Sequence, residues 1–279
     1  MPKNRKLAVR IVSSIACVLF FVTCFSFSGN CVTYETSSNY DSSIFHQRLL
    51  DTALTGNPRV DLINIALSQY GYSEGNNNWQ LSGMEIGIGN HTEYGRWYGV
   101  QSMWCAMFVS WCAAQANIPD MVIPSHAYTV SGVLWFMDNT KVHSREEVEE
   151  GSYIPQAGDI IYFRSDRNES LVNHVGIVLG FFDGYLYTIE GNINFDPYCT
   201  DGGQVLLRNR HISDPYIRYF CCPKYNSDET HTISTFFPKS SERPVAAEAE
   251  ITVSPPADNT VDTPDSVSTS EKSQYHFIP

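Results

Sequence analysis

Hydrophobic residues follow a helical period in the first half of the chain and a strand-like pattern in the second half. Residues 60–71, VDLINIALSQYG, place apolar side chains at spacings of three and four and end at a glycine, which predicts a helix. The apolar run SMWCAMFVSWCAAQANIP, residues 102–119, predicts a second helix, and residues 124–139 predict a third helix after a turn.

Five later segments are rich in β-branched and aromatic residues, and Gly, Asp or Pro residues separate them. They are DIIYF (159–163), HVGIVLGF (174–181), YLYTIEGN (185–192), QVLLRNRHI (204–212) and IRYFC (217–221). Helices followed by strands are typical of the α+β class. We therefore expect N-terminal helices that pack on one mostly antiparallel sheet.

The two ends of the chain differ from this folded pattern. Basic residues, an apolar run and small residues follow one another in residues 1–28, which predicts a secretory signal peptide. An uncleaved membrane anchor is the alternative, because the run approaches the ~20 residues that span a bilayer. Residues 29–57 have the polar composition of a linker, residues 58–224 form the predicted domain, and residues 225–279 read as a disordered acidic tail rich in Ser, Thr and Pro.

The net charge and the spacing of the cysteines indicate which partners and cofactors to expect. The net charge of −12 makes a nucleic acid an unexpected partner, and we expect a monomer. The cysteines form neither a CxxC pair nor a Cys/His pattern at zinc spacing, so we expect no metal and no other cofactor. Export would permit disulfides, and we predict a bridge from Cys199 to Cys221 or Cys222.

Cys105 and Cys112 lie on the same predicted helix but have different expected roles. Seven residues of helix separate them by about 10 Å, whereas a disulfide needs Cα atoms within about 7 Å, so they cannot pair. Cys112 lies among Trp, Val and Ala in the middle of the helix and is expected in the core. Cys105 lies where a loop becomes helix, and free backbone N–H groups there favour a thiolate. Cys105 is therefore the candidate nucleophile.

A nucleophilic cysteine needs a base, and His174 is the best placed of the eight histidines. It opens NHVGIVLG, the most apolar predicted strand, and Gly176 leaves room above it for a ligand. A core histidine with satisfied hydrogen bonds is the alternative interpretation, and composition does not separate the two.

The turn after this strand decides which residue faces His174. A turn of two residues, 183–184, would put Glu190 on the opposite face of the hairpin. A turn of three residues, 182–184, would set Glu190 opposite Gly176, on the face that carries His174. We predict the three-residue turn.

Four segments in this order resemble the CHAP family of cysteine, histidine-dependent amidohydrolases/peptidases. They are WCAMFVSW (104–111), AGDIIYF (157–163), NHVGIVLG (173–180) and YTIEGN (187–192). The resemblance covers about residues 58–222 and implies a papain-like fold related to the NlpC/P60 group. It also implies a secreted bacterial enzyme that cuts peptidoglycan, either at the N-acetylmuramoyl–L-alanine amide or within the stem peptide or cross-bridge.

The resemblance also implies roles for individual residues. Cys105 corresponds to the nucleophile, His174 to the base, Glu190 to the group that orients His174, and Asn192 to a supporting polar position. Aromatic residues that flank the nucleophile could line a substrate groove or belong to the core: Trp97, Tyr98 and Trp104.

Some relatives carry an acidic calcium loop before the nucleophile. The corresponding segment here, residues 74–90, is rich in amides and poor in acids, so we expect no calcium.

Two further functions remain open on the sequence alone. The main alternative is a non-catalytic secreted protein that binds the cell wall or acts as a scaffold on the same fold, because fold alone does not establish activity. Acyl transfer to an amine, as in a transglutaminase, could use the same residues. Export places any of these proteins outside the cell or in its wall, or at the membrane if the N-terminal segment stays uncleaved.

Overall fold

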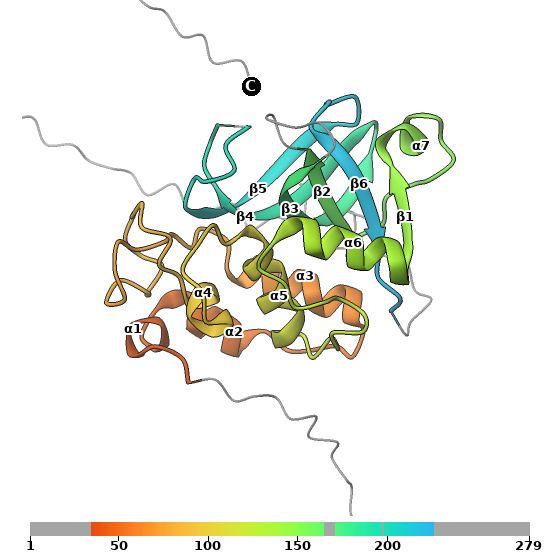
Figure 1. The fold of residues 1–279 in the computed structure, drawn as a ribbon. Coiled ribbons are helices and arrows are strands. Elements are labelled where there is room, and N and C mark those ends of the chain that lie inside the picture. Colours follow the sequence, from red (N-terminus) through yellow and green to blue (C-terminus); the bar gives the residue numbers. More distant parts are fainter. Residues whose placement is uncertain (1–34, 165–170, 197, 226–279) are drawn as a thin grey trace, which may run out of the picture. The chain divides into compact units, whose positions relative to one another are not determined.

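One six-stranded sheet forms the centre of the structure, which is a computed structural model that describes residues 35–164, 171–196 and 198–225. The strand order is β1-β6-β2-β3-β4-β5, and each neighbouring pair is antiparallel (Figure 1). The strands are β1 (Lys141–Ser144), β2 (Ile160–Arg164), β3 (Val172–Phe182), β4 (Tyr185–Ile193), β5 (Gln204–His211) and β6 (Ile217–Cys222). Strands β2 to β6 coincide with the five predicted segments, whereas β1 is an additional edge strand.

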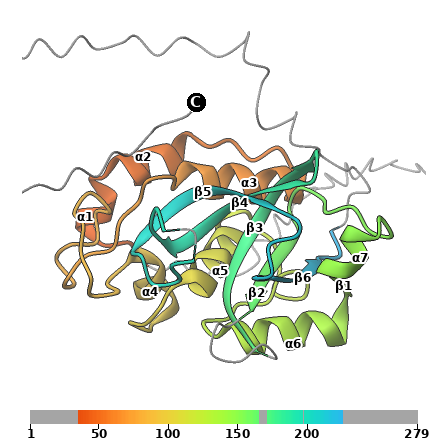
Figure 2. The same ribbon diagram turned by 90° about the horizontal axis from the view of Figure 1, so that it is seen from above.

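The helices are α1 (Ser38–Asp41), α2 (Ile44–Asp51), α3 (Pro58–Ser68), α4 (Glu93–Tyr98), α5 (Cys105–Gln115), α6 (Thr129–Asn139) and α7 (Arg145–Glu149). Helices α1 to α6 contribute to the core on one face of this sheet, whereas Val148 of α7 packs in a smaller cluster on the other face. Figures 1 and 2 show α3 and α5 on the same side of the sheet, with α6 near β1 and β6 and the short α7 beside β1. The arrangement confirms the predicted α+β class.

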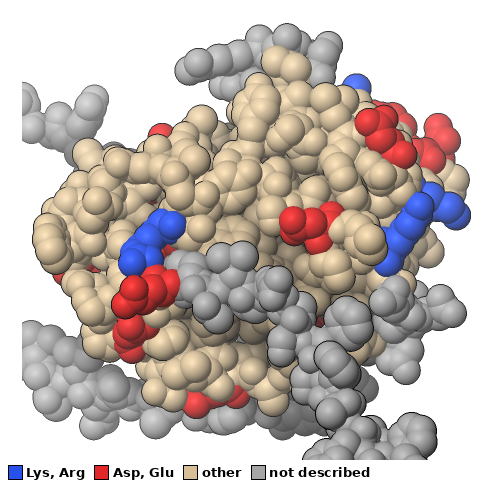
Figure 3. Space-filling view, turned by 60° about the horizontal axis from the view of Figure 1, so that its bottom comes forward, with Lys and Arg blue, Asp and Glu red and all other residues tan. Residues whose placement is uncertain are grey.

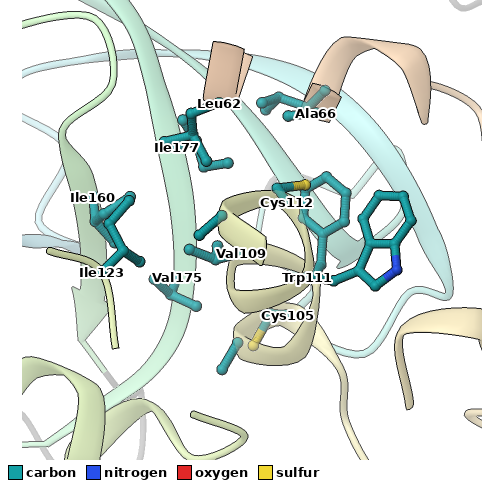
Figure 4. Packing of buried hydrophobic residues seen from close by; sticks show 14 of the residues in the cluster. Leu62, Ala66, Cys105, Val109, Trp111, Cys112, Ile123, Ile160, Val175 and Ile177 are labelled. Atoms are coloured by element: carbon teal, nitrogen blue, oxygen red, sulfur yellow. The ribbon is translucent and has the colours of Figure 1, made fainter. Parts of the chain in front are cut away.

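The larger hydrophobic core lies between the helices and the sheet, and α5 runs through its middle. Nine of the eleven residues of α5 are buried, because a helix that is apolar on all sides is stable only when it is surrounded. Figure 4 shows Val109 of α5 packed between Leu62 of α3 and Val175 and Ile177 of β3. The packing places the first residue of α5 next to the start of β3.

The predicted linker, residues 29–57, is wrong for its described part. Helices α1 and α2 lie within it, and Tyr40 and Phe45 belong to the main core. The serines that suggested a linker cap these helices instead, since Ser37 accepts a hydrogen bond from the backbone of Tyr40 and Ser43 accepts one from the backbone of His46. The described residues all belong to one compact unit.

The turn between β3 and β4 also differs from the prediction. Asp183 and Gly184 form a two-residue turn with φ of 51° and 77°, and Phe182 pairs with Tyr185. A shift in register between Val178 and Gly180 then adds one residue to β3. This bulge changes the alternation of faces, so Glu190 still pairs with Gly176, as expected for the three-residue turn. The predicted turn is wrong and the predicted pairing is confirmed.

Several other expectations concern the ends and the cysteines. The expected signal peptide or anchor lies outside the described residues, and so does all but the first residue of the expected tail. Among the described residues, no helix has the length and apolarity needed to cross a membrane.

All five cysteines in the described residues are free, so the predicted bridge from Cys199 to Cys221 or Cys222 is wrong. On the face shown in Figure 3, most of the visible surface that is not grey is uncharged, and acidic and basic side chains adjoin at its left side.

Candidate active site

Cys105 is the first residue of α5, as the sequence predicts. The N-terminus of α5 has no side-chain cap, because Trp104 occupies the cap position. The first N–H groups of a helix have no partner within the helix, so they are available near the Cys105 sulfur to a negatively charged group. The side chain is 4% exposed, which shields it from bulk water.

Cys112 lies at a different place on the same helix. Its sulfur points into the core toward α3, well away from the sulfur of Cys105 (Figure 4). Burial raises the pKa of the Cys112 thiol well above its usual range, because a thiolate there would have no water and no cation beside it. The structure therefore confirms that Cys112 is a core residue.

His174 and Glu190 form a buried pair on neighbouring strands. Nε2 of His174 donates a hydrogen bond of 2.9 Å to Oε2 of Glu190, and both side chains are almost completely enclosed. The second carboxylate oxygen accepts a hydrogen bond of 2.6 Å from the hydroxyl of Thr188. These bonds fix the imidazole ring and direct its other nitrogen, Nδ1, away from Glu190.

Nδ1 of His174 is the ring atom that remains for Cys105. It is a buried atom that no donor or acceptor of normal hydrogen-bond geometry satisfies among the described residues. The Cys105 side chain nevertheless lies close enough to the ring to help raise the pKa of His174. The Cys105 thiol, the imidazole and the Glu190 carboxylate are thus arranged in series.

Opposing effects set the charges of the pair. Burial by itself lowers the pKa of His174, but Cys105 and Glu190 outweigh burial and raise it well above the usual range. Burial by itself raises the pKa of Glu190, but His174 and Arg210 outweigh it and lower it well below the usual range. The stable form near neutral pH is therefore an imidazolium beside a carboxylate.

Two arginines on β5 complete this environment, and the sequence reasoning missed both. Arg208 and Arg210 come within 4.0 and 3.9 Å of Oε2 of Glu190. The pairing of β4 with β5 sets Thr188 opposite Arg208, so alternate residues of QVLLRNRHI share the face that carries Glu190. That alternation is the signal that could have placed them.

The space above Gly176 is occupied by the protein itself. A Cβ atom on Gly176 would lie 2.7 Å from Cγ of Glu190, so the Glu190 side chain fills the room that the sequence suggested for a ligand. The glycine is therefore what allows Glu190 to reach His174.

The Asn192 side chain supports a loop, and its hydrogen-bond partners among the described residues are Gly203 and Asp201 rather than the imidazole. Its φ is 63°, its amide oxygen accepts from the backbone of Gly203 at 3.1 Å, and its amide nitrogen donates to Asp201 at 3.2 Å. It thereby fixes the connection between β4 and β5, next to Glu190.

Trp104 does not line a substrate groove, so this part of the prediction for the three aromatic residues is wrong. Its side chain is completely buried, and its indole N–H donates to Oε2 of Glu74 at 2.7 Å, so it belongs to the core. Trp97 and Tyr98 are partly buried and pack against that core, and their contact with a substrate stays a prediction.

Glu74 is a second residue that the sequence reasoning missed. It is 3% exposed, and its carboxylate also accepts from the backbone of Asn90 at 3.2 Å. Its backbone N–H donates to the carbonyl of Gly203 at 2.8 Å. Glu74 therefore ties Trp104, the residue before Cys105, to Asn90 and to the loop that Asn192 holds.

The described residues contain no group of three His, Cys, Asp or Glu side chains that could hold a metal ion. The expectation that the site uses no calcium and no other cofactor stays a prediction.

Comparison with known proteins agrees with the geometry. The family model described as CHAP domain matches residues 97–192, a range that contains Cys105, His174 and Glu190. No curated protein and no solved structure gives a significant match to the chain. CHAP domains are generally hydrolases of the amidase or peptidase type. Residues 97–192 therefore match the CHAP domain model, in agreement with the resemblance that the order of the four motifs indicates.

Proposed function

We propose that the protein is an exported cysteine amidohydrolase/peptidase that cleaves amide bonds in peptidoglycan. The observation that carries this proposal is the series of Cys105, His174 and Glu190, with the cysteine at the uncapped start of a helix. A nucleophile, a base and a group that orients the base are the three parts that acyl transfer needs. The proposal that peptidoglycan is the substrate rests on the similarity to the CHAP family.

The reaction begins with the Cys105 sulfur as a thiolate and His174 as an imidazolium. The sulfur attacks the carbonyl carbon of the amide, and backbone N–H groups at the start of α5 hold the oxyanion that forms. The intermediate collapses as His174 gives its proton to the leaving amine, which leaves an acyl thioester on Cys105. His174 then removes a proton from water, and the hydroxide releases the acid and regenerates the thiolate.

Glu190 acts through His174 as a positioning residue. Its hydrogen bond holds the ring so that Nδ1 faces the sulfur, and its charge stabilises the imidazolium. Arg208 and Arg210 keep Glu190 ionised, so the proton of the imidazolium stays on His174.

One observation favours the alternative of a non-catalytic wall-binding or scaffold protein. Cys105 is 4% exposed and His174 is 1% exposed, so a substrate must displace neighbouring side chains to reach the sulfur. A protein of that kind would bind peptidoglycan and release nothing from it.

Mass spectrometry of the products distinguishes these functions. Purified peptidoglycan is incubated with the protein and with the Cys105→Ala variant, and the soluble fragments are identified. Free stem peptides that begin with L-alanine identify an amidase, and fragments cut within the stem or bridge identify an endopeptidase. Incorporation of an added amine identifies a transferase. If several wall types bind the protein and release no fragment that depends on Cys105, the non-catalytic alternative holds.

A further inference from the structure

Residues 78–92, helix α4 and the turn that follows α4 line a groove. Its volume is about 390 Å³, within the range of roughly 300–1,000 Å³ that is typical of sites for small ligands. The side chains that line it include Asn78, Asn90, His91, Thr92, Arg96 and Gln101. The mechanism above uses none of these side chains.

The wall of this groove is polar but carries little charge. Of the described residues that line it, none is acidic, and three carry amide side chains: Asn78, Asn90 and Gln101. Arg96 is exposed, and its guanidinium already donates to the backbone carbonyl of Glu35. An amide offers both donors and an acceptor, so this wall matches a neutral ligand that has hydroxyl and amide groups better than it matches an ion.

Two of the three amides hold the wall in shape through one end and leave the other end open. Oδ1 of Asn78 accepts a hydrogen bond from Nδ1 of His91 at 3.0 Å, and Nε2 of Gln101 donates to the carbonyl of Gly89 at 2.9 Å. No hydrogen bond to another described residue uses Nδ2 of Asn78 or Oε1 of Gln101. The groove therefore retains one donor and one acceptor whose side chains are already fixed.

Asn90 supplies a further acceptor. Its Oδ1 atom is buried, and no donor among the described residues satisfies it. Its backbone has a φ of 55°, in the left-handed region, so the chain holds this side chain in place at the cost of an unfavourable conformation. A buried acceptor costs free energy unless a ligand or water supplies a donor. The O–H or amide N–H of a neutral ligand is such a donor.

The carboxylate of Glu74 fixes the groove relative to the nucleophile. Its Oε1 accepts from the backbone N–H of Asn90 at 3.2 Å, and its Oε2 accepts from the indole N–H of Trp104 at 2.7 Å. Trp104 directly precedes Cys105 in the chain. A polymer that binds in the groove is thus held in a constant position relative to the sulfur.

We propose that this groove binds the glycan strand of peptidoglycan. The ring hydroxyls and N-acetyl groups of aminosugars are neutral donors and acceptors, which is the chemistry that the wall leaves unpaired. Oδ1 of Asn90 and Oε1 of Gln101 accept from the sugar, and Nδ2 of Asn78 donates to it. The strand itself is not cut, and its binding holds the polymer while the peptide part reaches Cys105. This inference rests on the proposed function.

Calorimetry with two separate parts of the substrate tests the groove. The full chain carrying Cys105→Ala is titrated with a GlcNAc–MurNAc tetrasaccharide that has no peptide, and with a stem peptide that has no sugar. We expect the tetrasaccharide to bind. A second substitution, Asn90→Gly, should then weaken its binding by about 3- to 10-fold, which corresponds to one lost hydrogen bond. Glycine adopts the left-handed backbone without strain, so this change removes only the side chain.

A second variant tests the opposite side of the groove. Asn78→Asp keeps an oxygen for His91 and removes the Nδ2 donor, so it should weaken binding of the tetrasaccharide by a similar factor. The matched control is Asn117→Gly, since Asn117 also has a φ of 55° but does not line the groove. It should bind the tetrasaccharide as the protein with Cys105→Ala alone does. Thermal unfolding checks that each variant is folded.

The outcomes separate the groove from the proposed function. Absence of tetrasaccharide binding, or binding that neither Asn90→Gly nor Asn78→Asp weakens, would overturn the glycan site even if the unchanged protein cuts peptidoglycan. Binding of the stem peptide that depends on Asn90 would assign the groove to peptide and overturn it as well. Tetrasaccharide binding through Asn90, in a chain whose unchanged form releases nothing from peptidoglycan, would keep the groove and count against the proposed function.

Discussion

Nε2 of His174 lies 2.9 Å from Oε2 of Glu190, although the strand partner of Glu190 is Gly176. The carboxylate reaches the imidazole diagonally across two strands because the glycine leaves space above the sheet. The orientation of the base therefore depends on three positions in two strands. Nε2 stays bonded to the carboxylate, and the ring keeps this orientation, only while this diagonal contact is kept.

The two cysteines of α5 should separate activity from stability. Cys105→Ala removes the nucleophile, so we expect hydrolysis to fall by at least about 1000-fold with little change in the free energy of unfolding. Cys112→Ala leaves a small cavity in the core and should cost about 1 kcal/mol of stability while most activity remains. Fragment release and urea unfolding of both variants check this. The roles would be exchanged if Cys112→Ala were the inactive variant.

The Glu190 carboxylate should set the alkaline limit of activity. It raises the pKa of His174, so its removal lowers that pKa, and the imidazolium is lost at a lower pH. In Glu190→Gln, the alkaline limb of kcat/KM against pH should move to lower pH, and kcat should fall by roughly 100-fold.

The pH profiles of the unchanged protein, Glu190→Gln and Glu150→Gln measure this effect. Glu150 is an exposed carboxylate on the far end of α7, so its variant should keep the original profile. An alkaline limb that stays in place in Glu190→Gln would show that this carboxylate does not control the base.

Gly176→Ala should displace Glu190 without touching the sulfur. The new Cβ would lie 2.7 Å from Cγ of Glu190, so the carboxylate must move away from His174. We expect a loss of about 1–3 kcal/mol in stability together with a lower kcat. In a Glu190→Ala background the same change should cost less, because the clashing side chain is gone. Equal costs in both backgrounds, measured by urea unfolding, would show that the strain lies elsewhere.

Glu74 should stabilise the segment that precedes Cys105. Glu74→Ala would leave the buried indole N–H of Trp104 without its acceptor and would loosen Asn90, at a cost of about 2–3 kcal/mol. Thermal and urea unfolding measure the loss, and kcat should fall because Trp104 precedes Cys105. Glu85→Ala is the control, since Glu85 is exposed in the same segment. Similar stability of the two variants would contradict this account.

Periodicity predicted the parts of the fold that are long and strongly apolar. Helix α5 and strands β2 to β6 lie where the sequence pattern placed them, because their burial requires continuous apolar runs. Helices α1 and α2 were missed because they are short and because their capping serines have the same composition as a linker.

The sequence predicted the three main residues of the site, but it did not predict the bulge and the arginines that hold them in place. The motif order picked out Cys105, His174 and Glu190, and the structure brings these three together. The bulge that sets the register of Glu190 has no clear signal in the sequence, since it depends on how two twisted strands pair. Arg208 and Arg210 were missed because the alternation along β5, which puts them on one face, was not combined with the pairing of β5 and β4.

The most direct test of the central claim compares loss of activity with alkylation of Cys105. The protein is treated with iodoacetamide for increasing times, and peptide mass spectrometry gives the modified fraction of each cysteine, while fragment release from peptidoglycan gives the remaining activity. The account predicts that the lost fraction of activity equals the modified fraction of Cys105, whatever happens at the partly exposed Cys199 and Cys222. Activity that survives full modification of Cys105, or a loss that follows another cysteine, would contradict it.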